Sequence, residues 1–195
     1  MLKNNKETSN KEAANGAKAM QLKNQADTKR LVLCALFVAL GVILGGLLSI
    51  PAMPLGVYSL KIGFGTLPVI LSGVLFGPVY GGIVGGLTDF LQAITFSKGA
   101  YMPWFTITGI LFGFIPGLFF IKKQKPTFVR ILIAVFAGQA VGSVMLNTFL
   151  ISTIYELPFW ATLTARAINQ AVMIPVYTVL VYYIIRALSR MKVIE

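Results

Sequence analysis

Histidine is absent from the sequence, cysteine occurs once, and charged residues are scarce. Of the 195 residues 12% are charged, whereas soluble domains carry about 25%. The lack of histidine excludes histidine-based catalysis, histidine-ligated metal and the usual switch near neutral pH. The lone Cys34 has no partner within the chain, which excludes a disulfide-stapled secreted fold, and we expect it to serve as a small apolar residue.

Several catalytic motifs are missing as well. The sequence has no G-x-x-x-x-G-K-[ST], so it does not bind ATP through a P-loop. It has no H-E-x-x-H and no paired-aspartate motif of an intramembrane protease, and its serines have no histidine to activate them. We therefore expect no enzyme activity, no cofactor and no metal.

Apolar residues are abundant: they make up 56% of the chain, and the mean hydropathy is +0.80. A helix that crosses a membrane needs about 20 mostly apolar residues. Six such segments can be delimited, and the second is short: 31–50, 62–76, 79–96, 104–121, 128–154 and 159–188. The sequence therefore predicts an all-α membrane protein with six transmembrane helices.

The basic residues indicate the orientation in the membrane. The formal net charge is +11, and the basic residues avoid the apolar segments. With both termini in the cytoplasm, 14 of the 17 basic residues lie on the inner side, as the positive-inside rule demands. Membrane orientation thus explains the charge, and nucleic acid is not an expected partner. We expect residues 1–30 to be a polar cytoplasmic tail and residues 31–195 to be a six-helix membrane domain.

A glycine series leads to an acidic residue in the third apolar segment. Gly81, Gly85 and Asp89 follow one another at a spacing of four, which places them on one helix face. Small residues allow helix backbones to approach closely in lipid, so the glycines favour tight packing. A carboxylate within a membrane span is costly and usually faces a cavity or a partner. Asp89 is therefore either part of a structural ion pair with Arg166 or a contact for a ligand.

Further polar residues are expected at a similar depth, in the outer half of other segments. Arg166, Asn169 and Gln170 share one face of the last segment. Asn147 comes from the fifth segment, and Gln92 continues the Asp89 face of the third. These side chains either form one polar cavity that opens outward or make scattered interhelical hydrogen bonds, and we favour the cavity.

Aromatic residues surround the same end of the molecule. Tyr101 and Trp104, whose loop adjoins the third segment, are the best candidates for stacking on a ligand, although an interfacial belt would also explain them.

Several motifs together carry a resemblance to a known family. They are Ala35-Leu-Phe-Val-Ala39, Ile62-Gly-Phe-Gly-Thr-Leu-Pro68, Leu75-Phe-Gly-Pro-Val-Tyr-Gly81, Gly85-Gly-Leu-Thr-Asp89 and Gly99-Ala-Tyr-Met-Pro-Trp-Phe-Thr106. In this order the sequence resembles the substrate-binding S component of an energy-coupling factor (ECF) vitamin transporter, and within that class the folate-specific branch. The resemblance covers residues 30–188.

The resemblance implies a multi-pass protein of the bacterial plasma membrane that captures folate outside. The vitamin is delivered inward when the chain docks to a transmembrane coupling subunit that carries two ATPases. Ala35 and Ala39 would form the flat docking surface, since small side chains suit a close helix contact.

The same resemblance suggests a role for each polar group. Asp89 would bind the pterin, Tyr101 and Trp104 would stack on the flat rings, and cations would hold the glutamate tail. The complete set of expected contacts is Asp89, Arg166, Tyr101, Trp104, Lys98, Lys61, Gln92, Asn147 and Asn169. The alternatives are an S component for pantothenate, hydroxymethylpyrimidine or riboflavin, and a stand-alone small secondary transporter.

Overall fold

The computed structural model describes residues 25, 27–47, 50–53, 60–96, 103–121, 126–154, 156 and 158–190. The chain divides into two compact units, residues 1–35 and residues 36–195. Within the first unit the described part is helical, and Arg30 forms a salt bridge of 3.9 Å with Asp27. Residues 1–24 of the predicted cytoplasmic tail lie outside the described residues.

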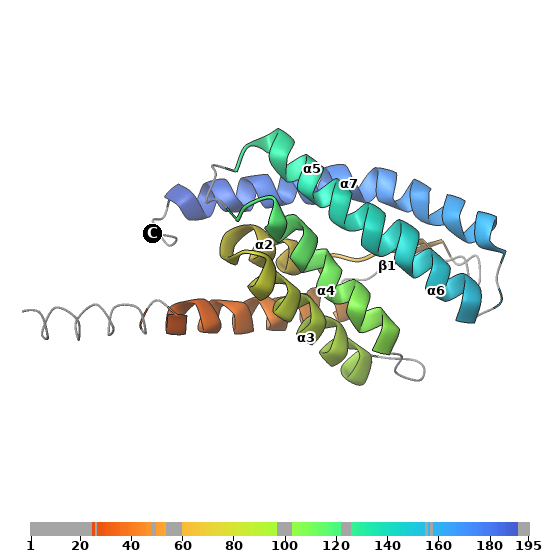
Figure 1. Cartoon of the computed structure of the whole chain (residues 1–195), viewed down its shortest axis with the longest axis horizontal. Coiled ribbons are helices and arrows are strands. Elements are labelled where there is room, and N and C mark those ends of the chain that lie inside the picture. The colour runs from red at the N-terminus through yellow and green to blue at the C-terminus, as the bar shows by residue number, and fades with distance from the viewer. Residues whose placement is uncertain are drawn as a thin grey trace, which may run out of the picture. The chain divides into compact units, whose positions relative to one another are not determined.

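Helices dominate the second unit, as predicted (Figure 1). The helix Asp27–Leu47 enters it from the first unit. The helices that follow are α2 (Thr66–Phe76), α3 (Pro78–Phe96), α4 (Pro103–Leu118), α5 (Phe128–Gln139), η2 (Ala140–Leu146), α6 (Asn147–Ile154) and α7 (Phe159–Arg190). Because α5, η2 and α6 are continuous, the described residues contain six helical spans, each of which corresponds to one predicted segment.

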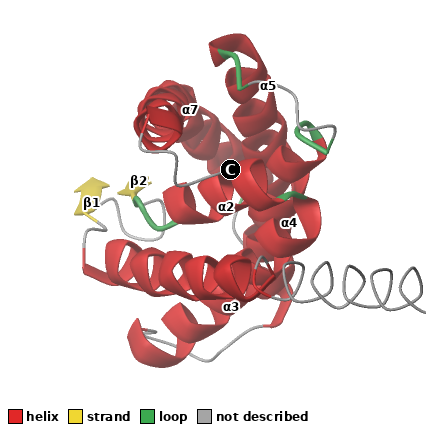
Figure 2. Ribbon diagram, turned by 90° about the vertical axis from the view of Figure 1, so that its left-hand side faces the viewer, coloured by secondary structure: helices red, strands yellow, loops and turns green. Residues whose placement is uncertain are grey.

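A short hairpin interrupts the pattern after the first span. Segment 31–50 is predicted to be helical to its end, but the helix ends at Leu47, and Ile50 begins strand β1 (Ile50–Met53). The residue before a proline is driven out of the α region, and Pro51 follows directly. Strand β1 pairs antiparallel with β2 (Leu60–Ile62), and Figure 2 shows the two strands next to α2.

The turn between α2 and α3 consists of one glycine. Gly77 has a φ of +94°, in the region that favours glycine, and its N–H donates to the Gly73 carbonyl. Pro78 then begins α3, where its missing N–H costs nothing and its fixed φ suits a helix. The sequence thus fixes a very tight connection between two spans.

Helices α3 and α4 are in close backbone contact. A Cβ at Gly81 would lie 2.5 Å from the carbonyl oxygen of Gly113, and a Cβ at Gly85 would overlap the carbonyl of Gly109. The predicted close packing of the α3 glycines is therefore confirmed. Its counterpart is a second spacing-of-four series on α4, which brings the Asp89 region of α3 against Thr106 and Gly109.

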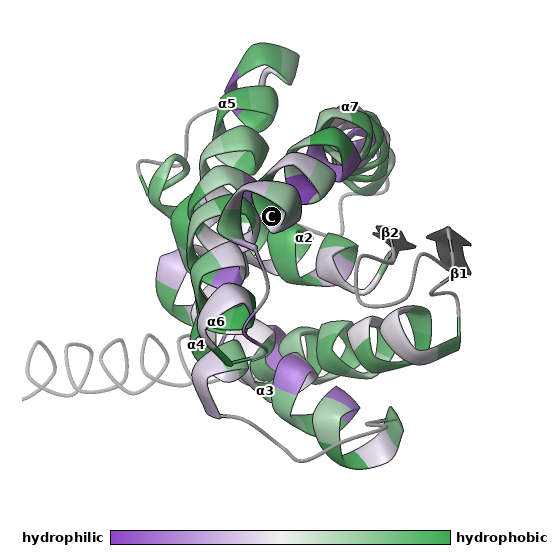
Figure 3. Cartoon of the chain, turned by 90° about the vertical axis from the view of Figure 1, so that its right-hand side faces the viewer, coloured by the Kyte–Doolittle hydropathy of each residue, from purple (hydrophilic) through white to green (hydrophobic). Residues whose placement is uncertain are grey.

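Large apolar side chains cover much of the outside of the helices. Leu87, Phe136, Phe149 and Val172 are among many that are exposed, and Figure 3 shows the helices as mainly hydrophobic along their lengths. Among the described residues, three helices are long and apolar enough to cross a membrane: Asp27–Leu47, Phe128–Ile154 and Phe159–Arg190. An apolar exterior is what a lipid environment requires.

Candidate functional site

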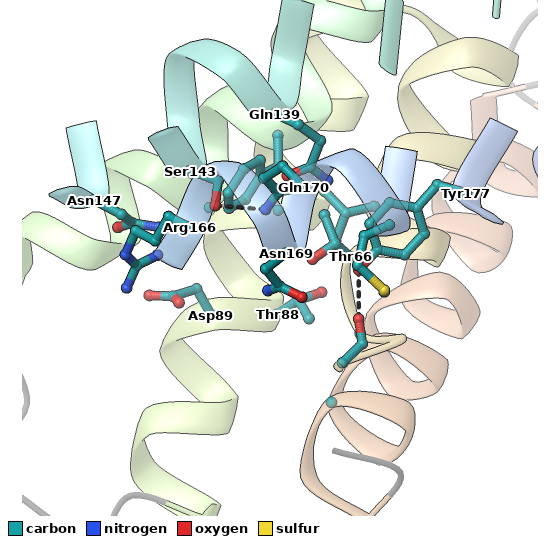
Figure 4. Close-up of a pocket in the computed structure, with 18 of the residues that line it drawn as sticks. Thr66, Thr88, Asp89, Gln139, Ser143, Asn147, Arg166, Asn169, Gln170 and Tyr177 are labelled. Atoms are coloured by element: carbon teal, nitrogen blue, oxygen red, sulfur yellow. Dashed lines mark hydrogen bonds between the residues drawn. The ribbon is translucent and has the colours of Figure 1, made fainter. Parts of the chain in front are cut away.

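A cavity of about 290 Å³ lies inside the second unit (Figure 4). Its wall combines α2, α3, α4, the continuous α5–η2–α6 span and α7 with Gly45 of the first span and the turn that precedes α2. Gly45, Gly65, Gly85 and Gly109 also line it, so backbone approaches the space directly at several points. The polar lining residues are Thr66, Thr88, Asp89, Gln92, Gln139, Ser143, Asn147, Thr162, Arg166, Asn169, Gln170 and Tyr177.

Two opposite charges face this cavity without forming an ion pair. Asp89 projects from α3 and Arg166 from α7, and Figure 4 shows their charged groups turned toward one another. Asp89 accepts a hydrogen bond of 3.0 Å from the Thr106 hydroxyl. Among the described residues the salt bridge within 4.0 Å is the one between Arg30 and Asp27, so the structural pair considered for Asp89 is not formed. Both charges are left available to a ligand.

Amide groups extend the polar wall beyond the charges. Gln170 donates from Nε2 to the Ser143 hydroxyl over 2.6 Å, which joins α7 to η2. Its Oε1 is buried without a hydrogen-bond partner among the described residues, and the same holds for Oδ1 of Asn147. Buried polar atoms are normally paired, so these two acceptors stand out beside the cavity.

Two hydrogen bonds connect polar side chains of the wall to backbone carbonyls of other segments. Gln92 donates from Nε2 to the Gly41 carbonyl over 2.9 Å, which holds the first span against α3. Tyr177 donates from its hydroxyl to the Gly63 carbonyl, which ties α7 to the turn before α2. Both bonds join segments that are far apart in the sequence and that contribute to the wall.

The structure brings five of the nine predicted ligand contacts into this one wall: Asp89, Gln92, Asn147, Arg166 and Asn169. Trp104 is not among the lining residues, and at the start of α4 it is 59% exposed. Lys98 and Tyr101 lie outside the described residues, as does the side chain of Lys61. Ala35 in the first unit and Ala39 in the second are each exposed. The functional roles of all these residues stay predictions.

Sequence reasoning missed half of the polar lining, although helical spacing carried the signal. Stepping back by four from Asn147 gives Ser143 and then Gln139. On α7 the stripe extends from Arg166 back to Thr162 and, beyond Gln170, forward to Tyr177. Thr88 and Thr66 carry no comparable signal, because threonine is common in packed helices. Among the described residues no three His, Cys, Asp or Glu side chains are grouped as metal ligands.

Comparison with known proteins gives a consistent family. Residues 29–185 match the family described as "ECF transporter, substrate-specific component". The folate transporter FolT of Clostridium novyi is 32% identical over 136 residues, which cover 70% of this chain and 78% of that protein. FolT of Streptococcus mutans is 27% identical over 167 residues, which cover 83% and 88%.

Solved structures give the same fold. The crystal structure of FolT bound with folic acid superposes with a TM-score of 0.67 at 26% identity and covers 78% of this chain and 90% of that chain. The S component for biotin from an ECF-type ABC transporter superposes with a TM-score of 0.69 at 22% identity and covers 86% and 94%. The second likeness supports the fold alone, which is that of a helical membrane protein.

Proposed function

The chain belongs to the family of substrate-specific components of ECF transporters, and on this premise we propose that it is the folate-binding component of such a transporter. It captures folate in the cavity from the outer side of the bacterial membrane and delivers it inward when docked to a coupling subunit with two ATPases. The relatives named folate transporter and the structural match to a folate complex support the choice of vitamin. The chain itself performs no chemical reaction.

The observation that carries this proposal is the pair of charges, with no ion pair between them, in a partly open polar cavity. An isolated charge inside a membrane protein is costly, so both groups await partners. The carboxylates of the folate glutamate moiety are suitable partners for Arg166, since guanidinium and carboxylate form paired hydrogen bonds. Asp89, Asn147 and Gln170 supply acceptors for N–H donors, which folate also carries.

The size of the cavity fits a vitamin that is enclosed in part. Pockets for small ligands measure about 300–1,000 Å³, and the volume here is about 290 Å³. The described residues therefore enclose one portion of a folate molecule, and the remainder extends toward the outer loops. Lys61, Lys98, Tyr101 and Trp104 remain the proposed contacts for that remainder.

Docking is proposed to use the exposed small side chains of the first span. Ala39 presents little more than backbone at the surface, and Ala35 lies one turn earlier in the sequence. A flat, small-residue surface permits close approach of a partner helix. Residues 1–30 are proposed to remain a cytoplasmic tail outside this contact.

Calorimetry on the purified chain in detergent tests the proposal. We expect a clear binding heat with folic acid, at one molecule per chain and without ATP, and none with pantothenate, hydroxymethylpyrimidine, riboflavin or thiamine. Heat with one of those vitamins and none with folic acid would overturn the choice of substrate. Uptake by the chain alone, without coupling and ATPase subunits, would favour the stand-alone transporter instead.

A further inference from the structure

One end of the cavity is polar but uncharged. Gln139 on α5, Ser143 on η2 and Gln170 on α7 line it, and each is at most 9% exposed. Burial of amides and hydroxyls in a membrane protein is costly unless hydrogen bonds replace the lost water. The Gln170 side-chain carbonyl has no such bond among the described residues. These groups therefore point to a ligand portion that is neutral and carries a hydrogen-bond donor.

The carboxamide of Gln170 is held in one orientation. Its Nε2 donates to the Ser143 hydroxyl over 2.6 Å, and Figure 4 shows this bond beside the cavity. The bond fixes which way the side-chain carbonyl points. Carboxamides distinguish heterocycles because they match a donor and an acceptor on one ring edge, as glutamine does with adenine.

The geometry of the helices separates this end from the charged end. The α5–η2–α6 span and α7 form consecutive antiparallel helices, and the Ser143–Gln170 bond fixes their register. Asn147 and Arg166 therefore both lie one turn beyond that bond in the same direction, whereas Gln139 lies one turn in the other. Gln139 and Asn147 are eight positions apart along the span and lie at the two ends of the π-helical stretch Ala140–Leu146. Two chemically different parts of one elongated ligand can thus be bound by different side chains.

We propose that Gln170, oriented by Ser143, is a specificity-determining residue that reads the heterocycle of the ligand at this uncharged end, while the Arg166 end holds its anionic part. The inference rests on the proposed function, in which the heterocycle is the pteridine ring of folate. It differs from the sequence-based expectation that Asp89 binds the pterin, because Asp89 faces Arg166 at the opposite end.

The test compares folic acid with pteroic acid, which has the same pteridine ring but lacks the glutamate. The dissociation constants of both are measured by calorimetry on wild type, Gln170→Met, Ser143→Ala, Asp89→Asn and Arg166→Gln. Ser189→Ala, at an exposed position near the end of α7, is the matched control for the serine variant. We expect Gln170→Met to weaken both ligands by the same factor, about 3- to 10-fold. The ratio of the two dissociation constants then stays at its wild-type value, whereas Arg166→Gln brings this ratio toward one.

Ser143→Ala leaves Gln170 in place and frees its amide, so we expect a smaller loss that is again equal for both ligands. This variant carries the test if Gln170→Met yields no folded protein. The inference is overturned if Gln170→Met or Ser143→Ala changes the ratio, or leaves both affinities unchanged. It is equally overturned if Asp89→Asn weakens pteroic acid and the Gln170 and Ser143 variants do not. A wild-type chain that binds no folic acid would refute the proposed function itself, which is a separate result.

Discussion

Replacement of Arg166 by glutamine tests two effects of this charge separately: its effect on the stability of the empty protein and its effect on the affinity for folate. The guanidinium is half-buried on α7, faces Asp89, and has no ion-pair partner among the described residues. Its loss removes an uncompensated charge, so the empty variant should melt no earlier than wild type. A hydrogen bond to a charged group contributes about 1.5–3 kcal/mol, so the folate dissociation constant should rise roughly 10- to 150-fold.

A thermal melt with and without ligand reports both effects. At a folate concentration 100 times the wild-type dissociation constant, wild type gains about 2.7 kcal/mol, and a variant that binds 100-fold more weakly gains about 0.4 kcal/mol. Arg186→Gln is the control, because Arg186 is exposed near the end of the same helix. An Arg166→Gln variant that melts much earlier when empty, yet keeps the full shift with folate, would show that Arg166 is structural.

Three further variants test packing, docking and the acidic residue. Gly113→Ala would press a methyl group onto an α3 carbonyl and should cost about 1–3 kcal/mol of stability in a melt. At Gly82 the nearest atom to an added Cβ is a side-chain methyl 3.3 Å away, so Gly82→Ala should cost less, and equal melts would contradict the close contact. Ala39→Trp should leave folate binding intact but stop uptake in cells with the coupling module, while Ile133→Trp, at an exposed apolar position on α5, should change neither binding nor uptake. Equal loss of binding and uptake in Ala39→Trp would mean that Ala39 packs internally. Asp89→Asn keeps an acceptor for the threonine hydroxyl on α4, so its melting temperature should change little, and a large drop would make Asp89 structural.

Hydropathy and turn residues in the sequence predicted the helices of the fold but not the residues at which all of them end. The six spans follow from apolar length, and the Gly77-Pro78 turn follows from the two residues that best suit it. The extension of the first helix to Ile50 was wrong, because hydropathy does not register that Pro51 removes its predecessor from the helical region. The π-helical turn at 140–146 has no signature in hydropathy either.

The part of the candidate site that consists of charged residues and their helical neighbours could be predicted from the sequence. A carboxylate and a guanidinium within apolar segments stand out against their surroundings, and both line the cavity. The bonds that shape its wall do not stand out, because Gln170 and Ser143 are 27 positions apart and Gln92 and Gly41 are 51 apart. Such pairs depend on helix register, which only the packed structure supplies.

Native mass spectrometry of the chain purified from bacterial membranes tests the central claim most directly. We predict one bound molecule per chain with the mass of a folate, and its loss in the Arg166→Gln variant under the same wash. A different vitamin at that stoichiometry, or folate retained equally by the variant, would contradict the account.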